Sequence, residues 1–389
     1  MKTAHAVTLT VLALLLPLAS HAQPPQPEQV GAFDDGGRTA TATYECPGHQ
    51  VLTRHLSLQN ALQKYTFQYS GCQDPSHKGE HPSAEGNFGM PTPVAANWYH
   101  SGFLTIDLNG KDVVRQDVKA MQVTESGARG AFQVIWSHPD AEVSLRIALL
   151  PGSNHVLCLL KWQLRPGATI KTFTVGLRCY PSFFTAARQR KGERHVMTPR
   201  TDQQEPTTLT LVPGQDPWLL YYDKVFDMAR GEGDGPCAAI VEQAGLQSGV
   251  VNIGDYAVMT YLKPKPEVGS LRFGLYDLAG STNAVAEAYM QAHGAEDLAQ
   301  LLAMDFRPEI VRTLDVAKLK ADAAGLVADA AEDGVALKPK VDAVIQRVEE
   351  LSAKGQSGDW QAEADLAGVI RDSEDLFWRL KTFAVLNRK

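Results

Sequence analysis

The stretch from Ala131 to Tyr180 constrains the fold most, because polar and apolar residues alternate along it in runs separated by turn residues. A period of two is typical of strands that bury one face of a sheet. The breaks between the runs carry Pro, Gly, Asp and Asn, which favour tight turns. We therefore predict a meander of four strands, Ala131–Ser137, Glu142–Leu150, His155–Leu164 and Ile170–Tyr180.

A hairpin centred on Pro166-Gly167 would join the last two of these strands and place Cys158 opposite Val175. In that register their apolar faces coincide, as a half-buried antiparallel sheet requires. Cys179 lies four residues beyond Val175, which at about 3.3 Å per residue puts it about 13 Å from Cys158. That separation is too large for a disulfide. We expect both to be buried thiols that pack as small apolar side chains.

The N-terminus has the features of a secretory signal peptide. Lys2 supplies a positive charge, Val7 to Leu18 is an apolar run too short to span a bilayer comfortably, and Ser20-His21-Ala22 resembles a cleavage site. We expect residues 1–22 to be removed and the chain to be exported to the periplasm or the extracellular space, with no membrane span in the mature chain. The alternative is an uncleaved anchor helix.

An exported chain with five cysteines raises the question of disulfides. Cys46 and Cys72 lie in polar, turn-rich surroundings and form the pair we favour. Cys237 would then be left without a partner.

The remainder of the chain divides by pattern. Residues 23–38 are rich in Pro, Gln, Gly and Asp and are expected to form a flexible leader. Residues 39–280 contain a dozen or so short strand-like runs. Residues 281–389 are rich in Ala, Glu, Asp and Lys, with apolar residues at helical spacing. The predicted fold is mainly β: a two-sheet antiparallel super-sandwich followed by a smaller C-terminal α-helical region.

Charge and motifs exclude several function classes. The net charge is −7 and no run of Lys and Arg offsets it, so we expect no nucleic-acid partner. The sequence has no P-loop, no Gly-x-Ser-x-Gly elbow and no dinucleotide fingerprint, and we expect no cofactor. Cys72, His77 and His81 have a loosely metal-like spacing, but Pro75 and Gly79 prevent a helix there, so we expect no metal.

The first candidate site is Asn97, Trp98, Tyr99 and His100, at the end of a long loop. Flat aromatic rings stack on the apolar face of a sugar while amide and imidazole groups meet its hydroxyls. The alternative is that Trp98 is a core residue at a strand entrance.

The second candidate site follows the meander. Arg178 and Tyr180 end a predicted strand, and the basic stretch after it includes Arg194 and His195. Clustered cations beside a sheet could hold the carboxylates or sulfates of an acidic polysaccharide. The alternative is a solvated basic loop.

The succession of strands, the Asn97-Trp98-Tyr99 entry and the strand end at Arg178 to Tyr180 resemble the super-sandwich of galactose mutarotase-like proteins. The resemblance implies a carbohydrate-processing fold over about Thr39 to Leu278. Mutarotases use two histidines and a carboxylate, and that set cannot be placed in this chain. We therefore expect a non-catalytic protein that interacts with a glycan or polysaccharide. The alternatives are a carbohydrate-active enzyme (a polysaccharide lyase, glycoside hydrolase or sugar epimerase) and a structural protein of the cell envelope.

Overall fold

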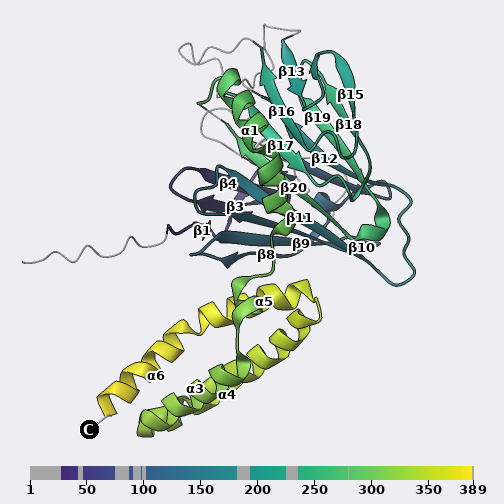
Figure 1. The fold of residues 1–389 in the computed structure, drawn as a ribbon. Helices are drawn as coiled ribbons and strands as arrows, with labels where there is room; N and C mark the ends of the chain where they lie inside the picture. Colours follow the sequence, from purple (N-terminus) through teal and green to yellow (C-terminus); the bar gives the residue numbers. More distant parts are fainter. Residues whose placement is uncertain are drawn as a thin grey trace, which may run out of the picture.

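The computed structural model describes residues 28–42, 47–74, 87–90, 98, 102–181, 193–224, 235–278 and 280–387. Two antiparallel β-sheets pack face to face, and a helical region follows them in the chain (Figure 1). The predicted fold class is confirmed. The signal peptide expected at residues 1–22 lies outside the described residues.

Within the described residues, the larger sheet has eleven strands in the order β1-β3-β4-β5-β6-β12-β19-β18-β15, with β2 beside β3 and β7 beside β6. Its strands are β1 (Gly31–Asp34), β2 (Arg38–Thr41), β3 (Gln50–Gln59), β4 (Lys64–Cys72), β5 (Asn87–Gly89), β6 (Leu104–Leu108), β7 (Lys111–Asp112), β12 (Phe173–Cys179), β15 (Thr207–Leu211), β18 (Leu246–Ile253) and β19 (Val258–Pro264).

The second sheet has nine strands in the described part of the chain, in the order β14-β13-β16-β17-β20-β11-β10-β9-β8. They are β8 (Asp117–Glu125), β9 (Gly130–Ser137), β10 (Ala141–Leu149), β11 (His155–Leu164), β13 (Arg194–Met197), β14 (Asp202–Gln204), β16 (Trp218–Asp223), β17 (Cys237–Val241) and β20 (Ser270–Asp277). Short 3-10 helices lie at Val113–Arg115 and Pro266–Val268.

The predicted meander is right for three strands and wrong for the fourth. Strands β9, β10 and β11 pair in sequence, as predicted. β12 does not pair with β11; it lies between β6 and β19 in the other sheet. The turn after Leu164 carries the chain across the sandwich, where the Trp162 and Phe173 rings meet edge to face at 4.7 Å. The apolar faces of β11 and β12 therefore oppose each other across the core, and alternation alone is satisfied equally well by that arrangement.

The predictions for two cysteines can be compared with the structure. Cys158 and Cys179 are buried and not bridged to each other, as expected. They belong to different sheets, so the separation predicted along one sheet does not apply to them. The suggested partner of Cys72, Cys46, lies outside the described residues.

The range 23–38, expected to be a flexible leader, contains a strand. β1 lies within that range and pairs with β3 along its whole length, and Val30 just before it is buried. Val30 also exchanges backbone hydrogen bonds with Gly127, beyond the end of β8. A chain rich in Gly and Asp is here fixed by an edge-strand pairing that composition does not reveal.

The main core fills the space between the sheets. The inward residues of the alternating strands meet there, and their rings interlock at short range: Phe67 lies 5.1 Å from Phe132 edge to face and 5.7 Å from Phe88 in a stacked arrangement. These side chains are fully buried. Such aromatic pairs stabilise a core beyond the free energy gained by removing their surface from water.

Helix α1 (Asn283–Ala303) covers the outer face of the nine-stranded sheet (Figure 1). Thr282 caps it by accepting a hydrogen bond from the Val285 amide. Its buried side chains, including Met290, share an apolar cluster with Trp218 of β16. Gly294 permits this approach, since a β-carbon there would lie 2.5 Å from the Trp218 ring.

The remaining helices form an arm that projects from the sandwich (Figure 1): α2 (Glu309–Thr313), α3 (Val316–Asp329), α4 (Ala331–Gln356), α5 (Trp360–Asp372) and α6 (Glu374–Asn387). The arm has apolar clusters of its own, built from buried side chains of α3, α4, α5 and α6. Among the described residues, no helix is both long and apolar enough to cross a membrane.

Candidate functional site

The structure places Trp98 in the core, which is the second of the two alternatives. Its ring is 1% exposed and packs edge to face against Phe103 and Tyr221, and its Nε1 donates a 2.9 Å hydrogen bond to the Tyr276 carbonyl. A ring enclosed in this way presents no face for a sugar to stack on. Asn97, Tyr99 and His100 lie outside the described residues.

Arg194 links the two sheets. Its side chain is fully buried, its Nε donates to the Asp223 carboxylate at 3.3 Å, and its Nη1 donates to the Asp255 carbonyl at 3.3 Å. Asp255 lies in the β18–β19 turn of the eleven-stranded sheet, whereas Arg194 and Asp223 lie in the nine-stranded one. An arginine enclosed in this manner joins the two sheets and presents no surface to an external ligand.

The His195 side chain lies on the outer face of the nine-stranded sheet. Its neighbour Val196 faces the core, whereas the His195 ring stacks on Tyr222 at 5.1 Å on the outer face of the sheet. Its Nδ1 lies 3.1 Å from the Asp202 carboxylate, which also accepts a 2.8 Å hydrogen bond from the Tyr222 hydroxyl. Burial and this carboxylate both raise the pKa of Tyr222. Alternation along β13 thus separates Arg194 from His195.

Arg178 and Tyr180 have different environments. Tyr180 is 1% exposed, and its ring meets the ring of Tyr256 edge to face at 5.2 Å. Arg178 is half-buried on the outer face of β12, with its Nε 3.1 Å from the Met259 sulfur. Tyr256, which the sequence did not single out, is 53% exposed at the tip of the β18–β19 turn. The predicted residues that are described therefore serve mainly the packing of the sandwich.

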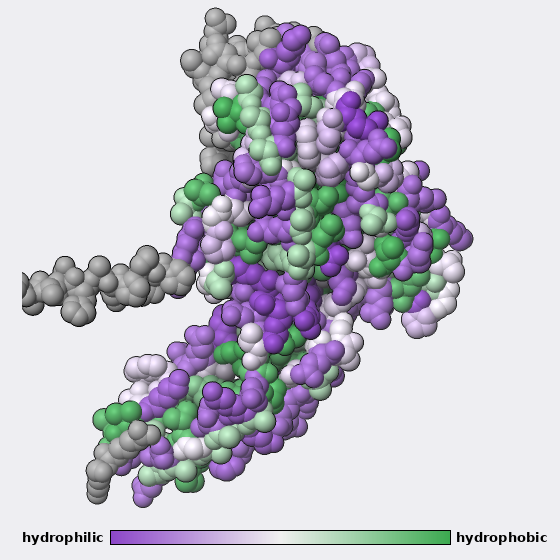
Figure 2. Space-filling view, in the orientation of Figure 1, coloured by the Kyte–Doolittle hydropathy of each residue, from purple (hydrophilic) through white to green (hydrophobic). Residues whose placement is uncertain are grey.

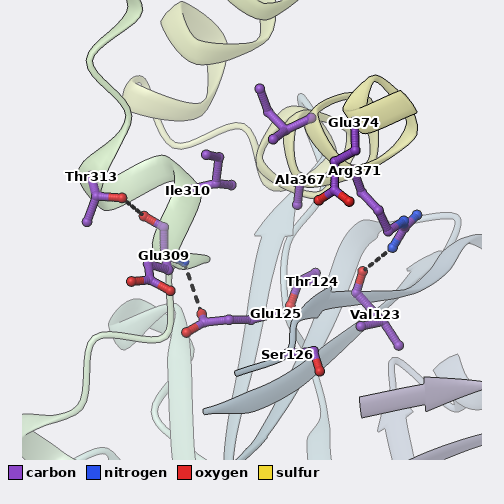
Figure 3. Close-up of a pocket in the computed structure, with 11 residues that line it drawn as sticks. Val123, Thr124, Glu125, Ser126, Glu309, Ile310, Thr313, Ala367, Arg371 and Glu374 are labelled. Atoms are coloured by element: carbon purple, nitrogen blue, oxygen red, sulfur yellow. Dashed lines mark hydrogen bonds between the residues drawn. The ribbon is translucent and has the colours of Figure 1, made fainter. Parts of the chain in front are cut away.

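A pocket that the sequence did not predict lies where the arm meets the sandwich (Figure 3). Its volume is about 380 Å³, and the surrounding surface is strongly hydrophilic (Figure 2). One wall is the end of β8, which is the edge strand of the nine-stranded sheet. The other walls come from α2, α5 and α6, and the lining is Val123, Thr124, Glu125, Ser126, Glu309, Ile310, Thr313, Ala367, Ile370, Arg371 and Glu374.

Glu125 anchors this pocket. Its side chain is nearly buried, and its Oε2 accepts hydrogen bonds from Arg129 Nε at 2.8 Å and from the Glu309 amide at 3.0 Å. Arg312 lies 3.8 Å from its other oxygen. Two guanidinium groups thus neutralise one carboxylate, and that carboxylate fixes the first turn of α2.

Two arginines on the outer face of the sheet hold the arm in place. Arg129 donates to the carbonyls of Asp305 and Arg307 in the segment between α1 and α2. Arg146 of β10 forms a buried ion pair with Glu363 of α5. Burial lowers the pKa of Arg146, and the Glu363 carboxylate partly opposes that effect. The pocket walls are therefore fixed by hydrogen bonds as well as by packing.

The mouth of the pocket carries polar groups of both kinds. Arg371, near the end of α5, donates from Nη1 to the Val123 carbonyl at 3.4 Å, and Glu374, the first residue of α6, lies beside it (Figure 3). Glu309 supplies a second exposed carboxylate, and Ile310 and Ile370 supply apolar surface. Carboxylate acceptors, a guanidinium donor and aliphatic surface together suit a ligand with many hydroxyl groups.

Comparison with protein-family models finds no match, and comparison with curated proteins finds none. The solved structures that are similar over part or most of the chain include two glycosidases and a TPR-domain containing protein. The α-N-acetylgalactosaminidase NagBb of Bifidobacterium bifidum, a quadruple mutant, is 14% identical with a TM-score of 0.34, over 68% of this chain and 41% of that one. A GH36 α-galactosidase of Geobacillus stearothermophilus, in complex with 1-deoxygalactonojirimycin, is 10% identical with a TM-score of 0.29, over 63% and 40%.

A TPR-domain containing protein of Parabacteroides distasonis is 12% identical with a TM-score of 0.33, over 92% of this chain and 80% of that one. This chain thus spans about two fifths of the length of the two glycosidases. At these TM-scores nothing about function is taken from the likeness, and the galactose mutarotase resemblance stays a prediction.

Proposed function

We propose that this protein binds carbohydrate without turning it over, and that it does so at the pocket between β8 and the arm. The observation that supports this most is that the exposed Arg371 and Glu374 both line the mouth of a 380 Å³ pocket. That volume lies within the range of about 300–1,000 Å³ typical of small-molecule sites. A guanidinium and a carboxylate that lie side by side can donate to and accept from adjacent hydroxyls of one sugar ring.

The charge of the pocket narrows the ligand class. The carboxylates of Glu125, Glu309 and Glu374 are balanced by the guanidinium groups of Arg129, Arg312 and Arg371. A pocket without net charge gives no electrostatic advantage to a sulfate or uronate group. We therefore propose a neutral glycan, in place of the acidic polysaccharide considered for the basic stretch around Arg194.

We propose a non-catalytic role because the polar contacts of Glu125 are structural. Glycoside hydrolysis requires a protonated carboxylic acid opposite a second carboxylate. Glu125 is the most buried carboxylate of the pocket, and its oxygens contact Arg129, Arg312 and the Glu309 amide. These contacts hold α2, and we assign Glu125 no role in proton transfer.

The test is calorimetric titration of the full chain with a panel of neutral, amino-bearing and acidic oligosaccharides. We expect binding by neutral sugars and an affinity at least tenfold lower in Glu374→Gln. Glu350→Gln, on the exposed face of α4, is the matched control and should bind like the wild type. The absence of binding across the panel, or an unchanged affinity in Glu374→Gln, would refute the proposal. Release of reducing ends from a bound glycan would refute the non-catalytic part alone.

Export completes this proposal, since a glycan-binding protein outside the cytoplasm meets cell-envelope and environmental polysaccharides. The apolar run and the Ser20-His21-Ala22 sequence support it. Intact-mass measurement of protein from its native host should give a mature N-terminus at or close to Gln23. A chain that retains residues 1–22 would contradict export by this route.

A further inference from the structure

We propose that Cys179 and Cys237 form a disulfide that joins the two sheets when the chain folds in an oxidising compartment. Cys179 ends β12 in the eleven-stranded sheet, and Cys237 begins β17 in the nine-stranded sheet. Both side chains are at most 1% exposed and belong to the core between the sheets. A disulfide between the two sheets of a sandwich is a known device of immunoglobulin domains.

Strand register brings the two cysteines to the same place. Cys179 pairs with Val258 on β19. Two residues further along β19, the Thr260 hydroxyl lies 2.9 Å from the hydroxyl of Tyr221, across the sandwich. Tyr221 pairs in turn with Cys237. The two cysteines therefore lie beside the same cross-sheet hydrogen bond, one in each sheet.

Trp98, from a third segment of the chain, contacts both Cys179 and Tyr221. Its backbone forms a bridge with Cys179, and its ring contacts that of Tyr221 at 5.9 Å. The pKa of the Cys237 thiol is raised first by burial and then by the neighbouring Cys179 thiol. Cys158, on β11, is equally buried, and burial alone raises its pKa. The structure thus contains one pair of neighbouring thiols and one isolated thiol within the described core.

The oxidation proceeds by thiol–disulfide exchange with an external disulfide, either oxidised glutathione or a disulfide oxidoreductase. The thiolate of one cysteine attacks a sulfur of the oxidant and expels one thiol, which leaves a mixed disulfide. The second thiolate attacks the protein sulfur of that mixed disulfide and expels the second thiol. Two electrons pass to the oxidant, and the two cysteine protons leave with its two thiols.

Burial of the two thiols determines at which stage of folding the disulfide can form. The thiolate is the nucleophile, and a thiol whose pKa is raised by enclosure in an apolar core neither ionises nor meets an external oxidant. The bond must therefore form while the sheets close. Once formed, it would hold together the end of the sandwich that Arg194 also joins.

The test is peptide mapping of the full chain after folding with oxidised and reduced glutathione. The protein is unfolded and alkylated without reductant. We expect a peptide pair linked through Cys179 and Cys237 and an alkylated Cys158. Alkylation of both Cys179 and Cys237, or a linkage of either one to another cysteine, would overturn the inference.

Thermal melts give a second measurement. Reduction should lower the Tm of the wild type and of Cys158→Val by the same amount, and should lower the Tm of Cys179→Val by less. An equal loss in all three proteins would overturn the inference. Mapping of the wild type decides the question even where a variant does not fold.

Discussion

His155 is a buried base in the interface between the nine-stranded sheet and α1. It is 2% exposed, and its ring stacks on Tyr276 at 4.5 Å. Its Nδ1 lies 3.2 Å from the Ser153 hydroxyl, and its Nε2 has no partner in the described part of the chain. Burial lowers the pKa of His155 from 6.5 to about 4, and the charge of Asp297 opposes this only in part.

The direction of the pH effect follows from this shift. Above pH 6.5 the His155 ring is neutral in both the folded and the unfolded chain, so it does not lower the free energy of unfolding. As the pH falls below 6.5 the unfolded chain takes up a proton that the folded chain refuses, so the free energy of unfolding decreases until the folded pKa of about 4 is reached. With these two pKa values, the loss between pH 7 and pH 5 is about 2 kcal/mol.

The test is urea unfolding at pH 7 and pH 5 of the wild type and of His155→Phe, which keeps a ring against Tyr276 but cannot titrate. The variant should lose about 2 kcal/mol less stability than the wild type over this interval. His293→Phe, at an exposed position on α1, is the control and should behave like the wild type. If His155→Phe and the wild type lose the same free energy, the buried neutral histidine is not the cause of acid sensitivity.

Two further predictions concern packing and the arm. Trp98→Ala should lower the free energy of unfolding by about 3–5 kcal/mol, because it opens a cavity in the core; urea unfolding measures this, and a loss below 1 kcal/mol, on the order of an exposed site, would refute the buried position. Glu363→Gln leaves the Arg146 charge buried and should cost about 3–5 kcal/mol. The double variant Arg146→Met/Glu363→Gln should recover part of that loss, and a double-mutant cycle without coupling would contradict the ion pair.

Much of the fold could be predicted because alternation reports which face of a strand is buried. It identified β9, β10 and β11, whereas the register predicted between β11 and the next strand is wrong. It could not identify the sheet to which β12 belongs, because a strand that faces β11 across a core and a strand that pairs with it show the same pattern. Only the partners on either side, β6 and β19, decide the question, and β19 lies more than eighty residues further along the chain.

No local sequence pattern predicts the pocket between β8 and the arm. Glu125, Glu309 and Glu374 lie far apart in the sequence and meet only because Arg129 and Arg146 hold the arm against the sheet. In the sequence each is one acidic residue among 44. Conversely, Trp98 and Arg194 were predicted to bind a ligand because they are aromatic and cationic, and both are buried. Residue type suggests a ligand, but burial decides whether the group is available to bind one.

The position of β8 has a consequence for solubility. As the last strand of its sheet, it presents a row of backbone groups on which a strand from another chain could assemble. Two register shifts distort this edge, α5 packs against it, and Arg371 occupies the Val123 carbonyl. We therefore expect the arm to prevent strands of other chains from pairing with β8. A chain that ends before α2 would leave this edge open, and light scattering should then detect self-association that the full chain does not show.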